Sequence, residues 1–180
     1  MNNTCNELTL SYKCDNIILE NFTCFSGGIM KKIVFICTGN ICRSPMAEHY
    51  MQGKIEILKK ENDYLIDSCG IYANSGEKAT NNAIEAIKKY GINMQNHRSK
   101  NISEIDINDF DLVISLTKQH KETIIRLYPS TKGKIYTLKE YVDPNLDYKD
   151  IDDPWGYNLN IYKSCAAEIV EYVDKLIEKF

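Results

Sequence analysis

One stretch constrains the fold of this chain more than any other. It runs from Lys31 to Pro45 and reads KKIVFICTGNICRSP. Its first half is apolar and β-branched, which predicts a buried strand. Its end predicts the start of a helix, because Ser44 is a good N-cap residue and Pro45 suits the first helical position. The sequence therefore predicts a strand, a short loop, and a helix whose N-terminus points at the loop.

The predicted loop carries Cys37 at its start and Arg43 at its end. Successive backbone N–H groups of such a loop point inward, and the helix dipole adds partial positive charge behind them. The arrangement suits a tetrahedral oxyanion such as phosphate, to which Arg43 can add two parallel charged hydrogen bonds. The same field would stabilise the thiolate of Cys37, which we expect to be an activated nucleophile. A buried structural thiol is the alternative, but the glycine and asparagine of the loop favour the functional interpretation.

Downstream of this stretch, apolar patterns typical of strands and helices alternate. We expect helices at 46–60, 80–90, 118–128 and 158–180, and further strands at 64–69, 111–116 and 134–138. This order predicts an α/β fold: a three-layer sandwich with a four-stranded parallel sheet, helices on both faces, and the phosphate-binding loop after the first strand. Ligands of such sheets bind beyond the carboxyl ends of the strands, where Cys37 lies.

The residues from Val34 to Glu48, VFICTGNICRSPMAE, resemble the signature of the low-molecular-weight protein tyrosine phosphatases. The resemblance extends from Met30 to the C-terminus, so we expect residues 30–180 to form a single phosphatase domain. It implies that His97 hydrogen-bonds the loop asparagine and holds the shape of the loop. It also implies that phosphate is bound by Thr38, Gly39, Asn40, Ile41, Cys42, Arg43 and Ser44.

An aspartate-rich segment, 143–157, is the second stretch that indicates chemistry. A carboxylic acid near the thiol can protonate the leaving group and later activate water. The sequence DPWG that starts at Asp153 is similar to the family's general-acid motif, which implies that role for Asp153. Asp152 would support it as a neighbouring charge, and Trp155 would form an aromatic wall of the cleft. A solvated acidic loop is the alternative interpretation.

These residues imply a hydrolase that removes phosphate from proteins through a phosphocysteine, with no metal and no organic cofactor. The family also contains bacterial protein arginine phosphatases, which the sequence TLKEYV at 137–142 resembles. Members of that branch carry a threonine where this chain has Ile41, and its hydroxyl can orient a water molecule. The apolar bulk of Ile41 instead favours packing against the ring of phosphotyrosine.

Two other functions fit the same fold. Arsenate reduction needs resolving cysteines on a mobile segment, and residues 70–164 contain none. A phosphoprotein-binding module without turnover would not need Cys37, Arg43 and Asp153 together. Cys42 either fills a small apolar space or captures the oxidised nucleophile as a Cys37–Cys42 disulfide, which protects it from irreversible oxidation.

Residues 1–29 precede the region of resemblance and show neither sustained periodicity nor cap signals. They are interpreted as an edge strand, as a disordered or regulatory tail, or as an artefact of start-codon choice. The last is favoured because the codons of Gly27 and Gly28 could form a ribosome-binding sequence just before the Met30 codon.

Composition limits the kinds of molecule that this chain is expected to bind. The formal net charge of −3 provides no basic footprint for nucleic acid, and no apolar run is long enough for a membrane span. No cysteine pair or His–Cys cluster has zinc spacing. A reactive thiol favours a reducing compartment, so we expect a cytoplasmic monomer that acts on phosphorylated proteins.

Overall fold

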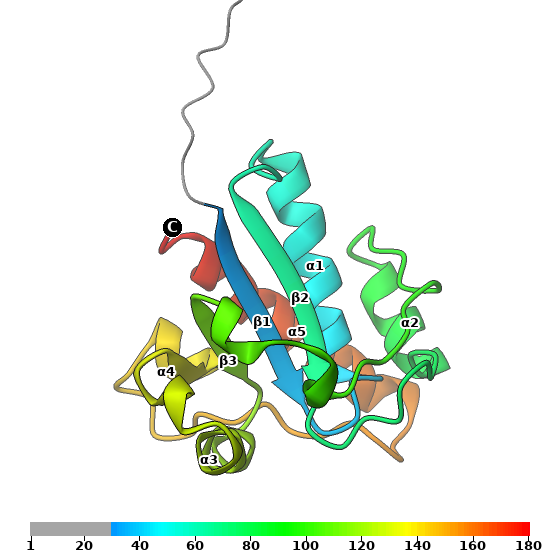
Figure 1. Cartoon of the computed structure of the whole chain (residues 1–180). Coiled ribbons are helices and arrows are strands. Elements are labelled where there is room, and N and C mark those ends of the chain that lie inside the picture. Colours follow the sequence, from blue (N-terminus) through cyan, green and yellow to red (C-terminus); the bar gives the residue numbers. More distant parts are fainter. Residues whose placement is uncertain (1–29) are drawn as a thin grey trace, which may run out of the picture.

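The computed structural model describes residues 30–180, and the interpretations of residues 1–29 fall outside the described part. Four strands form one parallel sheet in the order β2-β1-β3-β4 (Figure 1). The strands are β1 Lys31–Cys37, β2 Tyr64–Gly70, β3 Leu112–Ser115 and β4 Ile135–Thr137. In the register, Ile36 of β1 lies opposite Cys69 on one side and Ser115 on the other.

Helices cover both faces of the sheet. They are α1 Arg43–Ile57, α2 Asn81–Lys88, α3 Lys118–Leu127, α4 Leu138–Val142 and α5 Leu159–Ile177. Helices α1, α2 and α5 share one apolar core with one face of the sheet, and α3 packs with the other face. Figure 1 shows α1 and α5 behind β1 and β2, whereas α3 is seen below β3. The predicted α/β architecture is confirmed.

Strand β1 supplies side chains to both cores, because successive residues of a strand point to opposite faces. Phe35 packs in the core under α1 and α5, whereas Val34 and Ile36 pack in the core that contains Ile124 of α3. All of these side chains are fully buried. Burial of each large apolar side chain stabilises the fold by about 1.5–3 kcal/mol, so β1 is held rigidly in the centre.

The predicted start of the first helix is wrong in detail. Helix α1 begins at Arg43, and Cys42 occupies the N-cap position without a side-chain cap. Ser44 lies inside the first turn, so it is not the N-cap, and its hydroxyl is engaged elsewhere. Its Oγ lies 3.0 Å from Cys37 Sγ, accepts from Asn40 Nδ2 at 3.0 Å and donates to Cys69 O at 3.3 Å. Within the described part of the chain, the N-terminus of α1 therefore keeps unpaired backbone donors, as helix ends do when no side chain caps them.

Other helix boundaries differ from the predictions because polar side chains act as caps. Thr80 and Asn158 were expected inside helices, but each lies at an N-cap and accepts hydrogen bonds from the first turn. Thr137 ends β4 and caps α4, a short helix that the strand prediction for 134–138 did not contain. No helix within residues 30–180 is long and apolar enough to cross a lipid bilayer.

Candidate active site

Cys37 is the last residue of β1, at the carboxyl edge of the sheet (Figure 1). The strand order reverses at this point, because β2 lies on one side of β1 and β3 on the other. Parallel sheets bind ligands at such a reversal, since the loops on the two sides diverge and leave a crevice. The loop of residues 38–42 fills the base of this crevice and leads into α1.

The loop is shaped by Asn40, which is fully buried and has a φ of 53°. Asparagine tolerates this left-handed conformation better than most residues. Its Nδ2 donates to Ser44 Oγ at 3.0 Å and to Ser68 Oγ at 2.7 Å, and its Oδ1 accepts from Lys100 N at 2.8 Å. His97 Nε2 lies 2.8 Å from the Asn40 carbonyl oxygen. The predicted contact between His97 and Asn40 is therefore present, and every polar group of the Asn40 side chain is used.

Gly70 allows the loop to lie directly against β2. A Cβ atom at this position would lie 2.7 Å from the carbonyl oxygen of Thr38 and 2.8 Å from the backbone nitrogen of Asn40. No side chain fits at those distances. The next two residues, Ile71 and Tyr72, donate their backbone N–H groups to Cys37 O and Thr38 O, each at 2.9 Å. These bonds turn the loop carbonyls outward and its N–H groups inward.

The interior of the loop has the properties of an anion site. Within residues 30–180, the backbone N–H groups from Thr38 to Arg43 donate to no protein acceptor. Arg43 Nε is buried and also has no partner in the described part of the chain. The sulfur of Cys37 lies at the base, where Ser44 Oγ is its one polar contact among residues 30–180. These donors and the dipole of α1 favour an oxyanion next to the thiol.

The aspartate-rich segment lies across the mouth of this site. Arg43 Nη2 donates to Asp153 Oδ2 at 2.6 Å, and Arg43 Nη1 donates to the carbonyl oxygen of Ile151 at 3.1 Å. Ile151 N in turn donates to Leu116 O at 2.8 Å, which attaches the segment to the end of β3. The Arg43 side chain is 4% exposed and the Asp153 side chain 48%, so the carboxyl group is open to the cleft.

A cleft of about 340 Å³ opens above the thiol. Ile41 contributes apolar surface to its wall, and the rings of Tyr72 and Trp155 stand at its mouth with most of their surface exposed. Trp155 therefore lies at the cleft, and its predicted role as an aromatic wall for the substrate stays a prediction. The complete lining is Cys37, Thr38, Gly39, Ile41, Cys42, Arg43, Tyr72, Asn74, Glu77, Asp153 and Trp155.

Asp152 lies beside Asp153 in the chain, but its carboxylate faces another group. Asp152 Oδ1 accepts from Tyr148 Oη at 2.5 Å, and this bond raises the pKa of Tyr148 to about 12. This hydrogen bond joins two residues of the aspartate-rich segment, so Asp152 stabilises the conformation of that segment. Its predicted support of Asp153 stays a prediction.

Cys42 lies next to the anion site and is almost completely buried. Its sulfur is 3.3 Å from Tyr162 Oη and 3.5 Å from Thr80 Oγ1. Burial raises the pKa of the Cys42 thiol, which keeps it protonated near neutral pH. All four cysteines of the described region, Cys37, Cys42, Cys69 and Cys165, are free thiols. The predicted redox role of Cys42 stays a prediction.

Two site residues have no signal in the sequence. Ser68 of β2 accepts from Asn40 and joins the loop to the sheet. His120 of α3 lies with Nε2 at 2.9 Å from Thr38 Oγ1. Burial, together with the charge of Arg43, lowers the pKa of His120 to about 4, so its ring is neutral near pH 7. Both residues lie far from the loop in the sequence and belong to elements without a motif.

Fold and site together define a phosphatase of the thiol-dependent class: an oxyanion fits the free N–H groups, the thiol lies behind it, and a carboxyl group faces it. A comparison with known protein families supports the same class. The family model described as "Low molecular weight phosphotyrosine protein phosphatase" matches residues 32–180, and the chain belongs to this family.

Similar proteins act on more than one phosphorylated residue. A protein-arginine-phosphatase of Bacillus subtilis is 36% identical over 148 residues, which cover 82% of this chain and 95% of that protein. The crystal structure of a low molecular weight protein tyrosine phosphatase from T. tengcongensis has a TM-score of 0.77 and 40% identity, over 83% of this chain and 99% of the other. An arginine phosphatase mutant with a phosphorylated active site serine has a TM-score of 0.76 and 34% identity, over 82% and 94%.

Proposed function

We propose that this protein hydrolyses phosphotyrosine in proteins through a phosphocysteine intermediate on Cys37. The observation that carries the proposal is the position of the Cys37 sulfur at the base of a loop whose backbone N–H groups find no acceptor among the described residues. A phosphoryl group bound there has its phosphorus directly above the sulfur. Positioning and charge stabilisation of this kind are the main sources of catalysis in phosphoryl transfer.

In the first step the thiolate of Cys37 attacks phosphorus, the S–P bond forms, and the P–O bond to the leaving group breaks. The loop N–H groups and the Arg43 guanidinium bind the equatorial oxygens, where charge is spread in the transition state. Asp153 gives its proton to the departing oxygen. Its side chain is 48% exposed and open to the cleft, which supports this role once phosphate has displaced the carboxylate from Arg43.

In the second step a water molecule attacks the phosphocysteine and Asp153 accepts its proton. The S–P bond breaks and the electron pair returns to sulfur. Ser44 Oγ lies 3.0 Å from Cys37 Sγ, and its proton, which is donated to the carbonyl oxygen of Cys69 in this structure, turns to the departing thiolate. Asn40 and His97 take no part in bond making, but they hold the loop in the conformation that binds phosphate.

The lining of the cleft supports an aromatic substrate. Ile41 offers an apolar side chain beside the phosphate site, and Tyr72 and Trp155 offer exposed rings at the mouth. A phenyl ring can pack among these groups. Protein phosphoarginine is the second candidate, because the carboxylate of Glu77 also lines the cleft and suits a guanidinium.

A direct comparison tests the choice of substrate. The value of kcat/KM is measured for two peptides of one sequence, one with phosphotyrosine and one with phosphoarginine. We expect the phosphotyrosine peptide to be the better substrate. Ile41→Thr should shift the ratio toward phosphoarginine by about tenfold, the scale of one hydrogen bond. Ile41→Val is the matched control, since valine has the shape of threonine without the hydroxyl. A parent enzyme that prefers phosphoarginine would overturn the proposal.

The reactive thiol and the open cleft also bear on the compartment and the partners of the enzyme. A nucleophilic thiol works in a reducing compartment, which supports a cytoplasmic location. The open cleft suits phosphorylated proteins as substrates, and the net charge of −3 offers no attraction to nucleic acid. We propose that the monomer is the active form, because every group assigned above comes from one chain.

A further inference from the structure

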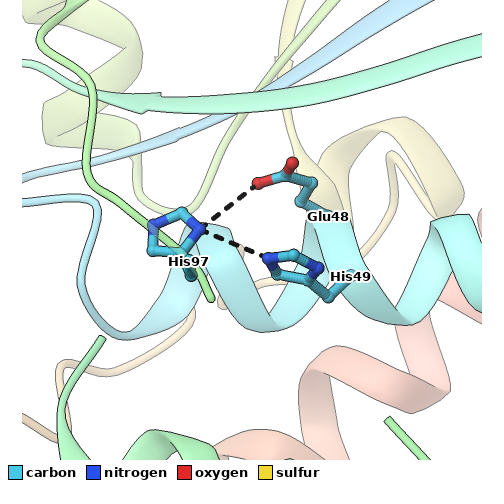
Figure 2. A group of neighbouring side chains, drawn as sticks. All are labelled: Glu48, His49 and His97. Atoms are coloured by element: carbon cyan, nitrogen blue, oxygen red, sulfur yellow. Dashed lines mark hydrogen bonds and ion pairs between the residues drawn. The ribbon is translucent and has the colours of Figure 1, made fainter. Parts of the chain in front are cut away.

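Three side chains that transfer no group in the proposed reaction converge behind the phosphate loop. Glu48 and His49 belong to α1, and His97 lies in the connection that follows α2 (Figure 2). His49 Nε2 is 3.3 Å from His97 Nδ1, and His97 Nδ1 is 3.9 Å from Glu48 Oε2. One ligand atom from each residue lies within 4.8 Å of the other two. We propose that this cluster is a binding site for a transition-metal ion such as Zn²⁺.

The donor set and its spacing fit zinc. Histidine nitrogen and carboxylate oxygen are common zinc ligands, and tetrahedral geometry with a Zn–N distance of about 2.0–2.1 Å separates two ligand atoms by about 3.3 Å. The two imidazole nitrogens already lie at this separation. The Glu48 oxygen needs to approach His97 Nδ1 by about 0.6 Å to reach it, and the His49 and Glu48 ligand atoms, which lie within 4.8 Å, need to close by up to about 1.5 Å. Three protein ligands leave the fourth position to water, on the side of the half-buried His49.

The two buried ligands are held in the orientation that a metal needs. His97 Nε2 donates its proton to the carbonyl oxygen of Asn40, so Nδ1 of the neutral ring carries the lone pair. Glu48 accepts from Ser68 Oγ at 2.5 Å and from Gln52 Nε2 at 3.2 Å. Ligating histidines in metalloproteins commonly donate their second nitrogen to a carbonyl group, and ligating carboxylates are themselves hydrogen-bonded.

Binding requires few proton movements. In the metal-free cluster, His49 Nε2–H donates to His97 Nδ1, so His49 must move its proton to Nδ1 before it can bind an ion. Burial lowers the pKa of both imidazoles, which are therefore neutral near pH 7. Burial raises the pKa of Glu48, and an ion must compete with a proton there. The nearby Lys100 is paired with Asp67, which offsets its charge.

The imidazole ring of His97 connects the proposed metal site to the phosphate-binding loop. His97 would bind the ion with Nδ1 and the Asn40 carbonyl with Nε2–H, and an ion on Nδ1 makes the opposite N–H a stronger donor. Metal binding is therefore expected to hold the loop in the conformation seen here and to raise the melting temperature. Cysteine spacing gives no sign of this site, because its ligands contain no sulfur and come from two separate segments.

The test is a titration of the full chain with Co²⁺, followed by absorption spectroscopy and calorimetry. We expect one ion to bind with ligand-field bands of a four-coordinate site and without the charge-transfer band of a thiolate ligand. His49→Gln should weaken binding at least about tenfold, and Ser68→Ala, which removes the hydrogen bond to Glu48, by about 10–100-fold. Glu56→Gln, an exposed carboxylate farther along α1, is the matched control and should bind as the parent does.

A replacement that adds sulfur keeps the proposal testable if His49→Gln unfolds. His49→Cys should still bind Co²⁺ and should add the thiolate band that the parent lacks. Thermal melting with Zn²⁺ provides a second readout, with a rise expected for the parent and none for His49→Gln. The proposal is overturned if His49→Gln binds Co²⁺ as the parent does, or if the parent spectrum shows thiolate ligation.

Discussion

Arg43 and Asp153, which are 110 residues apart in the sequence, form an ion pair with a distance of 2.6 Å between Nη2 and Oδ2. The arginine of the anion site is therefore already engaged by the proposed general acid. A bound phosphate has to replace that carboxylate oxygen with one of its own. The exchange frees Asp153 to turn toward the leaving group.

Asp153→Asn is expected to act on catalysis and on binding in opposite directions. Turnover of aryl and alkyl phosphates with poor leaving groups should fall by about 10²–10⁴-fold, and that of activated nitrophenyl esters much less. Phosphate or vanadate should bind more tightly, because Arg43 loses its competing partner. Steady-state kinetics over a series of leaving groups and inhibition by vanadate measure both effects. Asp152→Asn is the control, and equal sensitivity to all leaving groups would contradict the role of Asp153.

Arg43→Lys tests the geometry of the anion site at constant charge. The guanidinium reaches Asp153 and Ile151, its Nε has no partner within residues 30–180, and an ammonium group cannot replace this planar fork. We expect kcat/KM to fall by about 10²–10³-fold, the usual loss when one oxyanion donor is removed. Circular dichroism and the melting temperature show whether the fold is retained. Near-normal turnover in a folded variant would refute the assignment.

Cys42 is expected to protect the nucleophile from oxidation. Peroxide should abolish activity, and a dithiol should restore it, because the sulfenic acid of Cys37 is captured as a Cys37–Cys42 disulfide before it oxidises further. Cys42→Ser should lose activity permanently under the same exposure. The measurement is activity before exposure, after exposure, and after reduction, with Cys165→Ser as the control thiol. Full recovery of Cys42→Ser would leave Cys42 with a packing role only.

His120 should make the fold sensitive to acid. Its pKa is lowered from 6.5 to about 4 by burial and by Arg43, while the carboxylates of Asp153 and Asp150 oppose the shift. The unfolded chain therefore binds more protons between these values, and stability falls as the pH decreases from 6.5 to 4. The loss from this group alone is up to about 3 kcal/mol. Denaturant unfolding at several pH values measures it, and His120→Asn should flatten this part of the profile. An unchanged profile would show that other groups control it.

The fold and the anion site were predictable because one continuous stretch carries both. Residues 31–45 contain the strand pattern, the thiol, the loop and the arginine, so local rules are sufficient to place Cys37 at a strand end. The start of α1 was not predictable in the same way. The cap rule assigns Ser44 to the helix end, but its hydroxyl lies 3.0 Å from the Cys37 sulfur, a contact that propensities do not include.

Contacts between distant segments were predictable only by resemblance or not at all. The motif around Asp153 indicates its role, but its pairing with Arg43 depends on the path from β4 to α5. His120 reaches Thr38 from α3, and the cluster of Glu48, His49 and His97 joins α1 to a separate connection. Such contacts depend on how helices pack on the sheet, which periodicity alone does not specify.

The most direct test of the account is to trap the phosphoenzyme. Acid-quenched enzyme is digested with trypsin after brief mixing with an aryl phosphate, and the peptide of residues 33–43 is analysed by mass spectrometry. This peptide contains both Cys37 and Cys42, so fragment ions must locate the added group. We expect one phosphoryl group on Cys37, present also in Cys42→Ser and absent from Cys37→Ala. Turnover without this adduct, or an adduct on another residue, would contradict the proposed mechanism.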